Sequence, residues 1–450
     1  MSHDPFEELS PSQNSLIRPG IQFMRLSHIG WNLGGLALPL CVAALTVPHL
    51  IQHLGHERFG LLALAWGLIG YAGALDLGIG RALTQRVAQL RGETKLSAIP
   101  DVLATAGRIT LLTGLVGGVL IGLAGLVGGT RWIHVKSTPP AELQIAILLL
   151  AVALPAQAMS ATYRGLNEAY LNFSGISLVR AGLGIVNFAG PYWISLVTFK
   201  LHWLVATLVI SRLFALFVYR RLAIRCLRMD SRIENKGVYS PSVASSLFSF
   251  GGWVTVSGVV SPILVQADRF MIASVISAAA VSIYVVPYEL VVQSLILVGA
   301  VSSVMFPSLS RLMRESHNQW WPYFKSWIWR VAGVMAISCI ALALLLPTLL
   351  KLWIGERLQS ESIVVGQILC MGVFLNALGS MYYTVIHAKG RADVTAKIHL
   401  TELPLYIASL FFMIMNFGVI GAALTWVGRV FFDTSVLSWY VTWHVRSDRA

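Results

Sequence analysis

Charged side chains are scarce in this sequence. Asp, Glu, Lys and Arg together make up 12% of its 450 residues, whereas soluble domains contain about 25%. Hydrophobic residues reach 56%. A soluble core does not need that much apolar side chain, so the composition excludes a soluble globular protein and indicates a chain surrounded by lipid.

Cysteine is also rare, and a nucleotide-binding loop is missing. Three of the four cysteines, Cys41, Cys339 and Cys370, fall in apolar stretches, and Cys226 falls in a polar segment. This spacing excludes a disulfide framework and matches no metal-ligand pattern, so we expect free thiols. The absence of a GxxxxGK[ST] loop argues against ATP hydrolysis by this chain. We expect no cofactor.

The apolar residues are gathered into twelve stretches, each long enough to cross a bilayer. A hydrocarbon core of roughly 30 Å needs about 20 apolar helical residues. The predicted spans are 29–50, 59–80, 106–128, 142–162, 175–198, 202–222, 246–268, 281–306, 328–353, 362–386, 398–418 and 419–443. The prolines inside them are tolerated in membrane helices. The sequence therefore predicts an all-α polytopic membrane protein with about twelve transmembrane helices.

The net charge of +13 has a topological explanation. The segments richest in Lys and Arg all fall on one side of the twelve-span plan, and that side is cytoplasmic if the N-terminus is. They are Arg81–Arg108, Arg220–Lys236, Arg311–Arg330 and Lys389–Lys397. This asymmetry predicts cytoplasmic N- and C-termini. It explains the positive charge better than nucleic-acid binding does, because no soluble domain remains to hold a nucleic acid.

The polar segments divide the chain into two lobes. Residues 1–28 lack the features of a signal peptide and are expected to form a cytoplasmic tail. The predicted N-terminal six-helix lobe (29–222) and C-terminal six-helix lobe (246–443) flank a cytoplasmic linker (223–245), and a short tail (444–450) follows. Six spans is an even number, so both lobes start on the same side. That arrangement is typical of alternating-access transporters.

Several short motifs resemble one family of membrane proteins. They are Gly30-Trp31-Asn32, the run Leu54–Gly60, the run Leu75–Arg81, the run Ala267–Ile272 and the run Phe306–Ser310. In this order and spacing, over about residues 25–445, they resemble the polysaccharide (O-antigen type) flippases of the multidrug/oligosaccharidyl-lipid/polysaccharide exporter superfamily.

The resemblance carries expectations beyond the composition. It implies a V-shaped pair of six-helix bundles around a central cavity. It implies movement of undecaprenyl-pyrophosphate-linked oligosaccharide from the inner to the outer leaflet of the bacterial inner membrane, coupled to an ion gradient. The expected partners are the lipid-linked oligosaccharide and membrane lipids, with a polysaccharide polymerase and assembly proteins as further candidates.

Three arginines inside predicted spans are candidates for binding the cargo pyrophosphate, because the guanidinium matches phosphate oxygens and keeps its proton. Arg212 has no local partner. Arg429 has Asp433 four residues on, and the two form either an i,i+4 pair or part of a substrate site. Arg180 lies near a cytoplasmic end, where it either binds cargo or extends to the interface.

Intramembrane carboxylates are candidates for ion coupling. Glu289 lies in the eighth span without a local cation, and it is either a proton carrier or a structural protonated acid. Asp268, followed by Arg269, is expected near the outer end of the seventh span, where capping of that end is the favoured interpretation. Asp433 is the third candidate, and Glu402 is expected at the interface. Metal ligands are not predicted.

Two other functions remain open. A multidrug or cation exporter of the same superfamily would favour carboxylates facing a cationic drug, against which three intramembrane arginines argue. A polysaccharide polymerase or ligase would need a large outer loop, but the longest predicted outer loop spans only about residues 129–141. We therefore expect a transporter and not an enzyme. Tyrosines and tryptophans within spans, Trp66, Tyr284 and Tyr288 among them, are candidates for stacking on sugars or for packing.

Overall fold

The computed structural model describes residues 26–71, 76–129, 132–229, 237–315 and 319–446. Within these ranges the chain forms helices and no strand. The long helices are α1 (Leu26–Tyr71), α2 (Ile79–Gly92), α3 (Ile99–Ala124), α5 (Pro140–Ala169), α6 (Phe173–Ser195), α7 (Leu201–Met229), α8 (Pro241–Val275), α9 (Ala278–Val292), α10 (Leu295–Glu315), α11 (Trp320–Ile354), α12 (Ser360–Ala388) and α13 (Ala392–Tyr440). Short helices are η2 (Leu96–Ala98), η3 (Gly125–Gly129), η4 (Gly355–Arg357) and η5 (Val441–Val445).

The helices are long and apolar enough to confirm the predicted fold class. Among the described residues, 7 helices meet the length and hydropathy of a membrane span, and the bent pair α9–α10 makes up to 8. One of these, Asp393–Val445, has 53 residues. At 1.5 Å per residue it would be about 80 Å long, far more than one bilayer crossing. It must therefore contain two spans. The predicted total of twelve stays a prediction.

Two glycines divide the longest helices where the sequence predicts a boundary. Gly55 has φ 74° inside α1, and Gly418 has φ 59° inside α13. Only glycine adopts this left-handed conformation without a steric penalty, so the chain reverses at both positions. The predicted pair of spans 398–418 and 419–443 meets at Gly418.

Other predicted spans are interrupted. The predicted span 59–80 includes the end of α1 at Tyr71 and the start of α2 at Ile79. The predicted span 281–306 is broken between α9 and α10 with a bend of 40°. Residues 223–229 of the predicted linker continue α7, and residues 241–245 already belong to α8.

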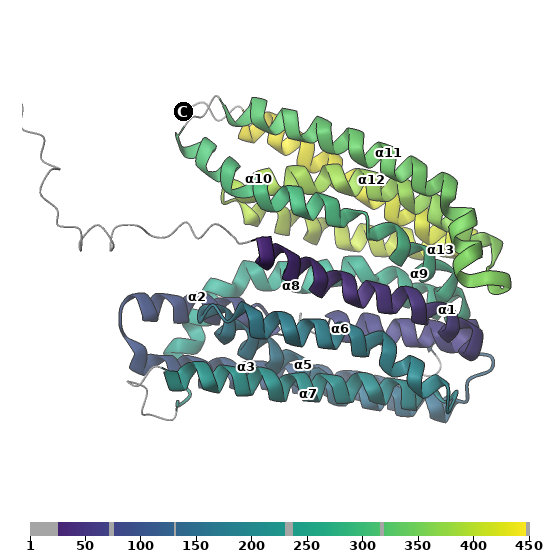
Figure 1. Ribbon diagram of the computed structural model, residues 1–450, viewed down its shortest axis with the longest axis horizontal. Helices are drawn as coiled ribbons and strands as arrows, with labels where there is room; N and C mark the ends of the chain where they lie inside the picture. The colour runs from purple at the N-terminus through teal and green to yellow at the C-terminus, as the bar shows by residue number, and fades with distance from the viewer. Residues whose placement is uncertain (1–25, 72–75, 130–131, 230–236, 316–318, 447–450) are drawn as a thin grey trace, which may run out of the picture.

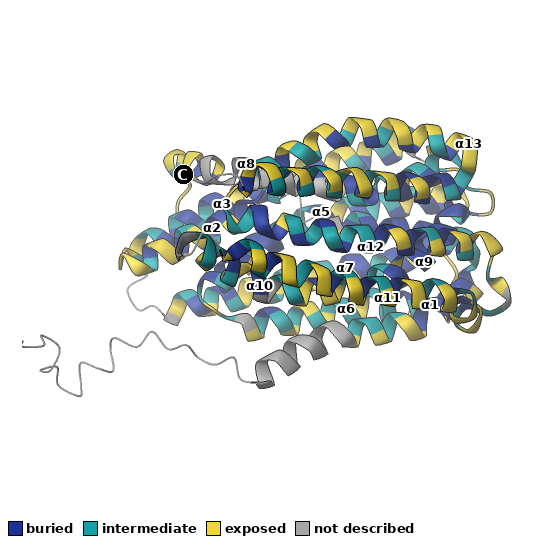
Figure 2. Ribbon diagram, turned by 90° about the horizontal axis from the view of Figure 1, so that it is seen from above, coloured by how far each residue is buried: buried dark blue, intermediate teal, exposed yellow. Residues whose placement is uncertain are grey.

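The helices form two groups that converge at one end of the molecule (Figure 1). Helices α2, α3, α5, α6 and α7 lie in the lower group, α10 to α13 lie in the upper group, and α1, α8 and α9 lie between them. The outward faces carry exposed residues and the inward faces carry buried ones (Figure 2). On α11 the exposed side chains include Ile337 at 72%, Leu344 at 74% and Leu352 at 81%. An apolar outer face of this kind is suited to contact with lipid.

Interhelix contacts close the end of the molecule where the two groups converge. His56, just after the bend of α1, contacts Ser282 Oγ of α9 at 2.8 Å and the carbonyl oxygen of Arg357 at 2.9 Å. Arg357 in turn donates to the carbonyl oxygen of Ile51 at 3.1 Å. Gly60 packs so tightly on α9 that an added Cβ would lie 1.8 Å from the carbonyl oxygen of Ala278. We call this end, defined by His56, Ser282 and Arg357, the closed end.

Candidate functional site

A cavity of about 710 Å³, lined by polar and charged side chains among apolar ones, lies between the two groups of helices. Its walls come from α1, α6, α8, α9, α10, α11, α12 and α13. The charged and amide side chains that line it are Asn187, Gln266, Arg269, Glu289, Gln293, Asn376 and Arg429. Its aromatic lining residues are Phe59, Trp66, Phe188, Tyr288, Trp353 and Trp426. A central cavity of this size and mixed chemistry is suited to an organic ligand with polar groups.

Arg269 and Glu289 form an ion pair in the wall of this central cavity. Arg269 Nη2 lies 2.8 Å from Glu289 Oε1, with side-chain exposures of 6% and 47%. The guanidinium also lies over the ring of Tyr288, 4.9 Å from its centroid. Arg269 Nε is buried and has no hydrogen-bond partner in the part of the chain that the structure describes. Glu289 has no cation within a turn of its own helix, as the sequence indicates, but α8 supplies one from 20 residues away in the chain.

Arg429 links the central cavity to a second group of charges. Its Nη1 donates to the carbonyl oxygen of Leu264 at 3.2 Å, and its Nε lies 3.8 Å from Glu402 Oε2. It also lies over the ring of Tyr406. The expected i,i+4 partner, Asp433, instead lies beside His399, with Asp433 Oδ1 3.7 Å from His399 Nε2. The partner of Arg429 thus comes from the other half of α13.

His399, Glu402 and Asp433 form a compact cluster within the second lobe. One ligand atom from each lies within 4.8 Å of the others. Glu402 is only 3% exposed, and neither of its carboxylate oxygens has a hydrogen-bond partner among the described residues. The expectation that Glu402 is interfacial is wrong. The bend at Gly418 folds the second half of α13 over the first half, and this packing buries Glu402.

Arg212 does not line the central cavity but supports its wall. Its Nη2 donates to Asn187 Oδ1 at 3.0 Å, and the Asn187 carbonyl oxygen accepts a hydrogen bond from Trp66 Nε1 at 3.0 Å. Asn187 and Trp66 are lining residues. Arg212 therefore positions two groups that a ligand would contact.

The remaining predicted site residues lie elsewhere. Arg180 is exposed on α6 and does not line the central cavity. Asp268 is fully buried and accepts hydrogen bonds from Tyr284 Oη at 2.6 Å and from the backbone N–H of Arg269 at 2.7 Å. The capping interpretation of Asp268–Arg269 is wrong, because α8 continues to Val275, about two turns beyond.

Of the aromatic residues proposed for either sugar stacking or packing, some line the central cavity and others are packed in the core. Trp66 and Tyr288 line the central cavity, whereas Tyr284 is fully buried against Asp268. Sequence reasoning missed Arg269 and Gln266 as site residues. Arg269 lies within the motif Ala267–Ile272 and Gln266 directly precedes it, and this motif is one of those that carry the family resemblance. Their position in the motif could have indicated a functional role.

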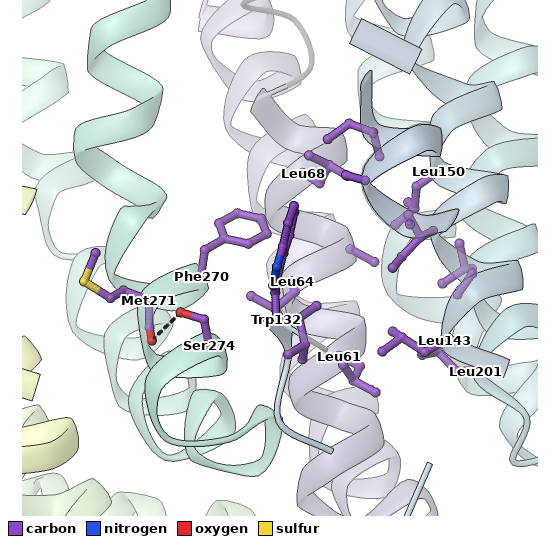
Figure 3. A pocket seen from close by; sticks show the side chains of 18 of the residues that line it. Leu61, Leu64, Leu68, Trp132, Leu143, Leu150, Leu201, Phe270, Met271 and Ser274 are labelled. Atoms are coloured by element: carbon purple, nitrogen blue, oxygen red, sulfur yellow. Dashed lines mark hydrogen bonds between the residues drawn. The ribbon is translucent and has the colours of Figure 1, made fainter. Parts of the chain in front are cut away.

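A second cavity, of about 470 Å³, is lined almost wholly by hydrocarbon (Figure 3). We call it the apolar cavity. It lies toward the closed end, between the second half of α1, the end of α3, the starts of α5 and α7, and the end of α8. Leu61, Leu64, Leu143, Leu150 and Phe270 are among its lining residues. Its chemistry contrasts with that of the central cavity.

This arrangement defines a class of protein: a multi-pass helical membrane transporter, with a polar cavity between two helical lobes. More particularly, the chain belongs to the polysaccharide biosynthesis protein family, whose model matches residues 28–313. The family predicted from the sequence motifs is thereby confirmed.

Relatives agree with this assignment. The chain is 30% identical to a putative O-antigen transporter of Shigella flexneri over 418 residues, which cover 92% of this chain and 96% of that protein. It is 22% identical to the lipopolysaccharide biosynthesis protein WzxC of Escherichia coli K12, over 92% of this chain and 80% of that protein.

Solved structures share the fold. The inward-facing conformation of a multidrug resistance MATE family transporter of the MOP superfamily has a TM-score of 0.76 at 12% identity, over 93% of this chain and 100% of that one. The outward-facing conformation of such a transporter has a TM-score of 0.64 at 11% identity, over 93% and 95%. At these identities the likeness concerns the fold alone.

Proposed function

We propose that this chain flips undecaprenyl-pyrophosphate-linked oligosaccharide across the bacterial inner membrane for surface polysaccharide synthesis. The observation that carries the proposal is the pair of largely buried guanidiniums, Arg269 and Arg429, in the wall of a polar cavity between the lobes. A charged headgroup in hydrocarbon costs roughly 3 kcal/mol or more. Fixed cations inside a protein cavity offset that cost for a pyrophosphate.

The cavity also suits the sugars of such a cargo. The lining offers amide donors and acceptors on Gln266, Gln293, Asn187 and Asn376. Within the described residues, the buried Gln266 Oε1 atom has no hydrogen-bond partner. Such groups favour a ligand that completes their hydrogen bonds. Flat aromatic faces beside them are suited to sugar rings.

The orientation follows from the positive-inside rule. The basic segments favour an orientation with the closed end on the outer side and both termini in the cytoplasm. In that orientation the described lobes meet at the outer side, and the cargo enters from the inner leaflet. Alternating access would then part His56 from Ser282 and Arg357.

We infer that an ion gradient drives the cycle through the Glu402–Asp433 pair. These two carboxylates share one nearby guanidinium, that of Arg429, among the described residues. With a neutral His399, the ionised cluster carries one negative charge too many for a buried site, and a proton or a monovalent cation would balance it. Arg429 lies in the walls of both sites, so occupancy of one changes affinity at the other.

A drug or cation exporter fits the cavity less well. Its lining carries two guanidiniums and one carboxylate, and that carboxylate is already paired with Arg269. A polymerase or ligase fits less well too, because the connection between η3 and α5 spans only residues 130–139.

The test is to replace Arg269 in cells that depend on this chain for their surface polysaccharide. Arg269→Gln removes a charge-assisted hydrogen bond to phosphate, worth about 1.5–3 kcal/mol, or roughly 10- to 100-fold in cargo affinity. We expect lipid-linked repeat units to accumulate and surface polymer to fall, with partial rescue in Arg269→Lys. Arg330→Gln, at an exposed arginine on the lipid-facing helix α11, is the control. Normal polymer in Arg269→Gln at equal protein abundance would overturn the proposal.

A further inference from the structure

The apolar cavity and the central cavity lie on opposite sides of one thin wall. The second half of α1 presents Leu64 and Leu68 to the apolar cavity, and Trp66 and Gly67 to the central cavity. The end of α8 behaves likewise. It presents Ala267, Phe270 and Met271 to the apolar cavity, and Gln266 and Arg269 to the central cavity.

The wall is only one layer of helix thick, which is about 10 Å with side chains. It has a seam where α1 meets α8. At Gly67 an added Cβ would lie 2.7 Å from Gln266 Oε1, so the missing side chain lets the amide rest against the α1 backbone. The atom that fills the seam is the end of a flexible side chain, which can rotate away without moving either helix.

The apolar cavity has a mouth on the membrane side. Trp132 and Phe270 both line the cavity, with Phe270 projecting from α8 toward Trp132 in Figure 3, and they are 61% and 38% exposed. Leu126 and Val127 of η3, close by in the chain, are 56% and 80% exposed. In a membrane these exposed apolar groups face hydrocarbon, so the mouth opens to lipid.

We propose that the apolar cavity binds the hydrocarbon tail of the cargo whose polar head occupies the central cavity. The covalent linkage between head and tail would cross the wall at the contact between Gly67 and Gln266. This inference rests on the proposed function and adds a tail subsite to it.

The adjoining cavities favour the cargo tail over a bulk phospholipid chain. A lipid-linked oligosaccharide joins a polar head to a long hydrocarbon chain through one phosphate linkage. Its tail must stay in an apolar environment while the head crosses, and the two sites must therefore be neighbours. A site for a bulk phospholipid has no reason to share a wall with the polar cavity, whereas a tail site must.

The position also fits a late step of transport. The apolar cavity lies toward the closed end, at the level where α5 and α7 begin. With that end facing outward, the subsite lies in the outer leaflet, where the tail arrives after the head has crossed.

The test is photolabelling of the purified full-length chain in nanodiscs. One probe is a polyprenyl phosphate with a diazirine on its chain, and the other is a phosphatidylglycerol with the same diazirine. Labelled residues are located by mass spectrometry. We expect the polyprenyl probe to label Phe270, Met271 and Trp132 in preference to the phospholipid probe.

Filling the cavity should remove this labelling. Ala146 is a buried lining residue on α5, and Ala146→Phe places a ring in the space that the chain would occupy. Ser274→Phe fills the same cavity from α8 and serves as a second, independent variant if Ala146→Phe does not fold. We expect each to lower polyprenyl labelling about tenfold. Ala341→Phe, which adds the same bulk on the exposed face of α11, should leave labelling unchanged.

Two results would overturn the inference. One is equal labelling of these residues by both probes, which would make the cavity a site for bulk lipid. The other is polyprenyl labelling that survives both fillings in folded protein. Transport of lipid-linked oligosaccharide by the wild type is measured separately, with the same purified protein in liposomes. If transport occurs without selective labelling, the tail subsite is wrong and the proposed function stands. If the wild type moves no cargo, the proposed function itself fails.

Discussion

At the residue scale, two buried or half-buried carboxylates, Glu289 and Glu402, are paired with cations that only the tertiary fold brings close to them. Glu289 has no cation within a helical turn, yet α8 places Arg269 Nη2 at 2.8 Å from it. Glu402 lies ten residues after the start of α13 and is buried once that helix folds back on itself. Helical spacing in a sequence predicts contacts between residues three or four positions apart. The partners of Glu289 and Glu402 lie 20 and 27 residues away in the chain, so spacing could not predict them.

The coupling role of the Glu402–Asp433 pair predicts a specific loss. Glu402→Gln keeps the shape and removes one negative charge, so the buried cluster no longer needs a balancing ion. We expect flipping in liposomes to persist but to lose its acceleration by an imposed gradient of protons or sodium. Rates are compared with and without each gradient.

A matched control is Glu168→Gln. Glu168 pairs with Arg164 one turn away and is not part of the cluster. It should respond to the gradient as the wild type does. A gradient response that survives in Glu402→Gln would exclude this residue from coupling.

Glu289 is expected to stabilise Arg269 and not to couple transport to an ion gradient. Glu289→Gln removes the ion-pair partner of the buried Arg269, which is destabilising in a low-dielectric site. We expect a lower thermal transition temperature for purified Glu289→Gln, with recovery when a pyrophosphate-bearing lipid is added. An unchanged transition without ligand would contradict the structural role of the pair.

At the element scale, glycines mark the bends that the sequence predicts best. The boundary between the last two predicted spans coincides with Gly418, and the motif at Leu54–Gly60 contains the bend at Gly55. The break between α9 and α10 was not predicted. Gln293 and Ser294 there include neither glycine nor proline, so the bend depends on packing that sequence patterns do not contain.

The contact between α1 and α9 predicts the effect of one added methyl group. In Gly60→Ala the new Cβ would overlap the Ala278 carbonyl, a backbone atom that cannot rotate away. The closed end should therefore be forced apart. We expect a cysteine introduced at Ser282 to react faster with a membrane-impermeant maleimide added from outside.

Gly70→Ala on the same helix is the comparison. Its Cβ would meet no atom of the described residues within 4 Å, so the labelling rate should match that of the parent. Equal rates in Gly60→Ala and Gly70→Ala would refute the view that this contact keeps the closed end shut.

At the scale of the whole molecule, the even span count and the charge distribution predict the orientation. Reporter fusions after Lys236 and after Lys397 should both report cytoplasm, because each follows a basic segment. A periplasmic signal at either position would reverse the assignment of the closed end to the outer side.

The fold class was predictable from the sequence, and the central cavity was not. Hydropathy alone predicts helices that span lipid, because every backbone group must be paired there. The lining of the cavity depends on which helix faces meet across two lobes. Of the three arginines singled out by sequence, Arg429 lines the cavity, Arg212 lies one layer behind the wall, and Arg180 is exposed and is not among the lining residues.

The central claim is that the cavity carries an anionic lipid-linked oligosaccharide across the bilayer. It is tested most directly with purified chain in liposomes that hold a labelled polyprenyl-pyrophosphate oligosaccharide in one leaflet. A lectin or glycosidase outside reports how much label reaches the other leaflet. The account predicts transfer well above protein-free liposomes, roughly 10- to 100-fold slower in Arg269→Gln. Transfer no faster than in protein-free liposomes, or equal in the wild type and Arg269→Gln, would contradict it.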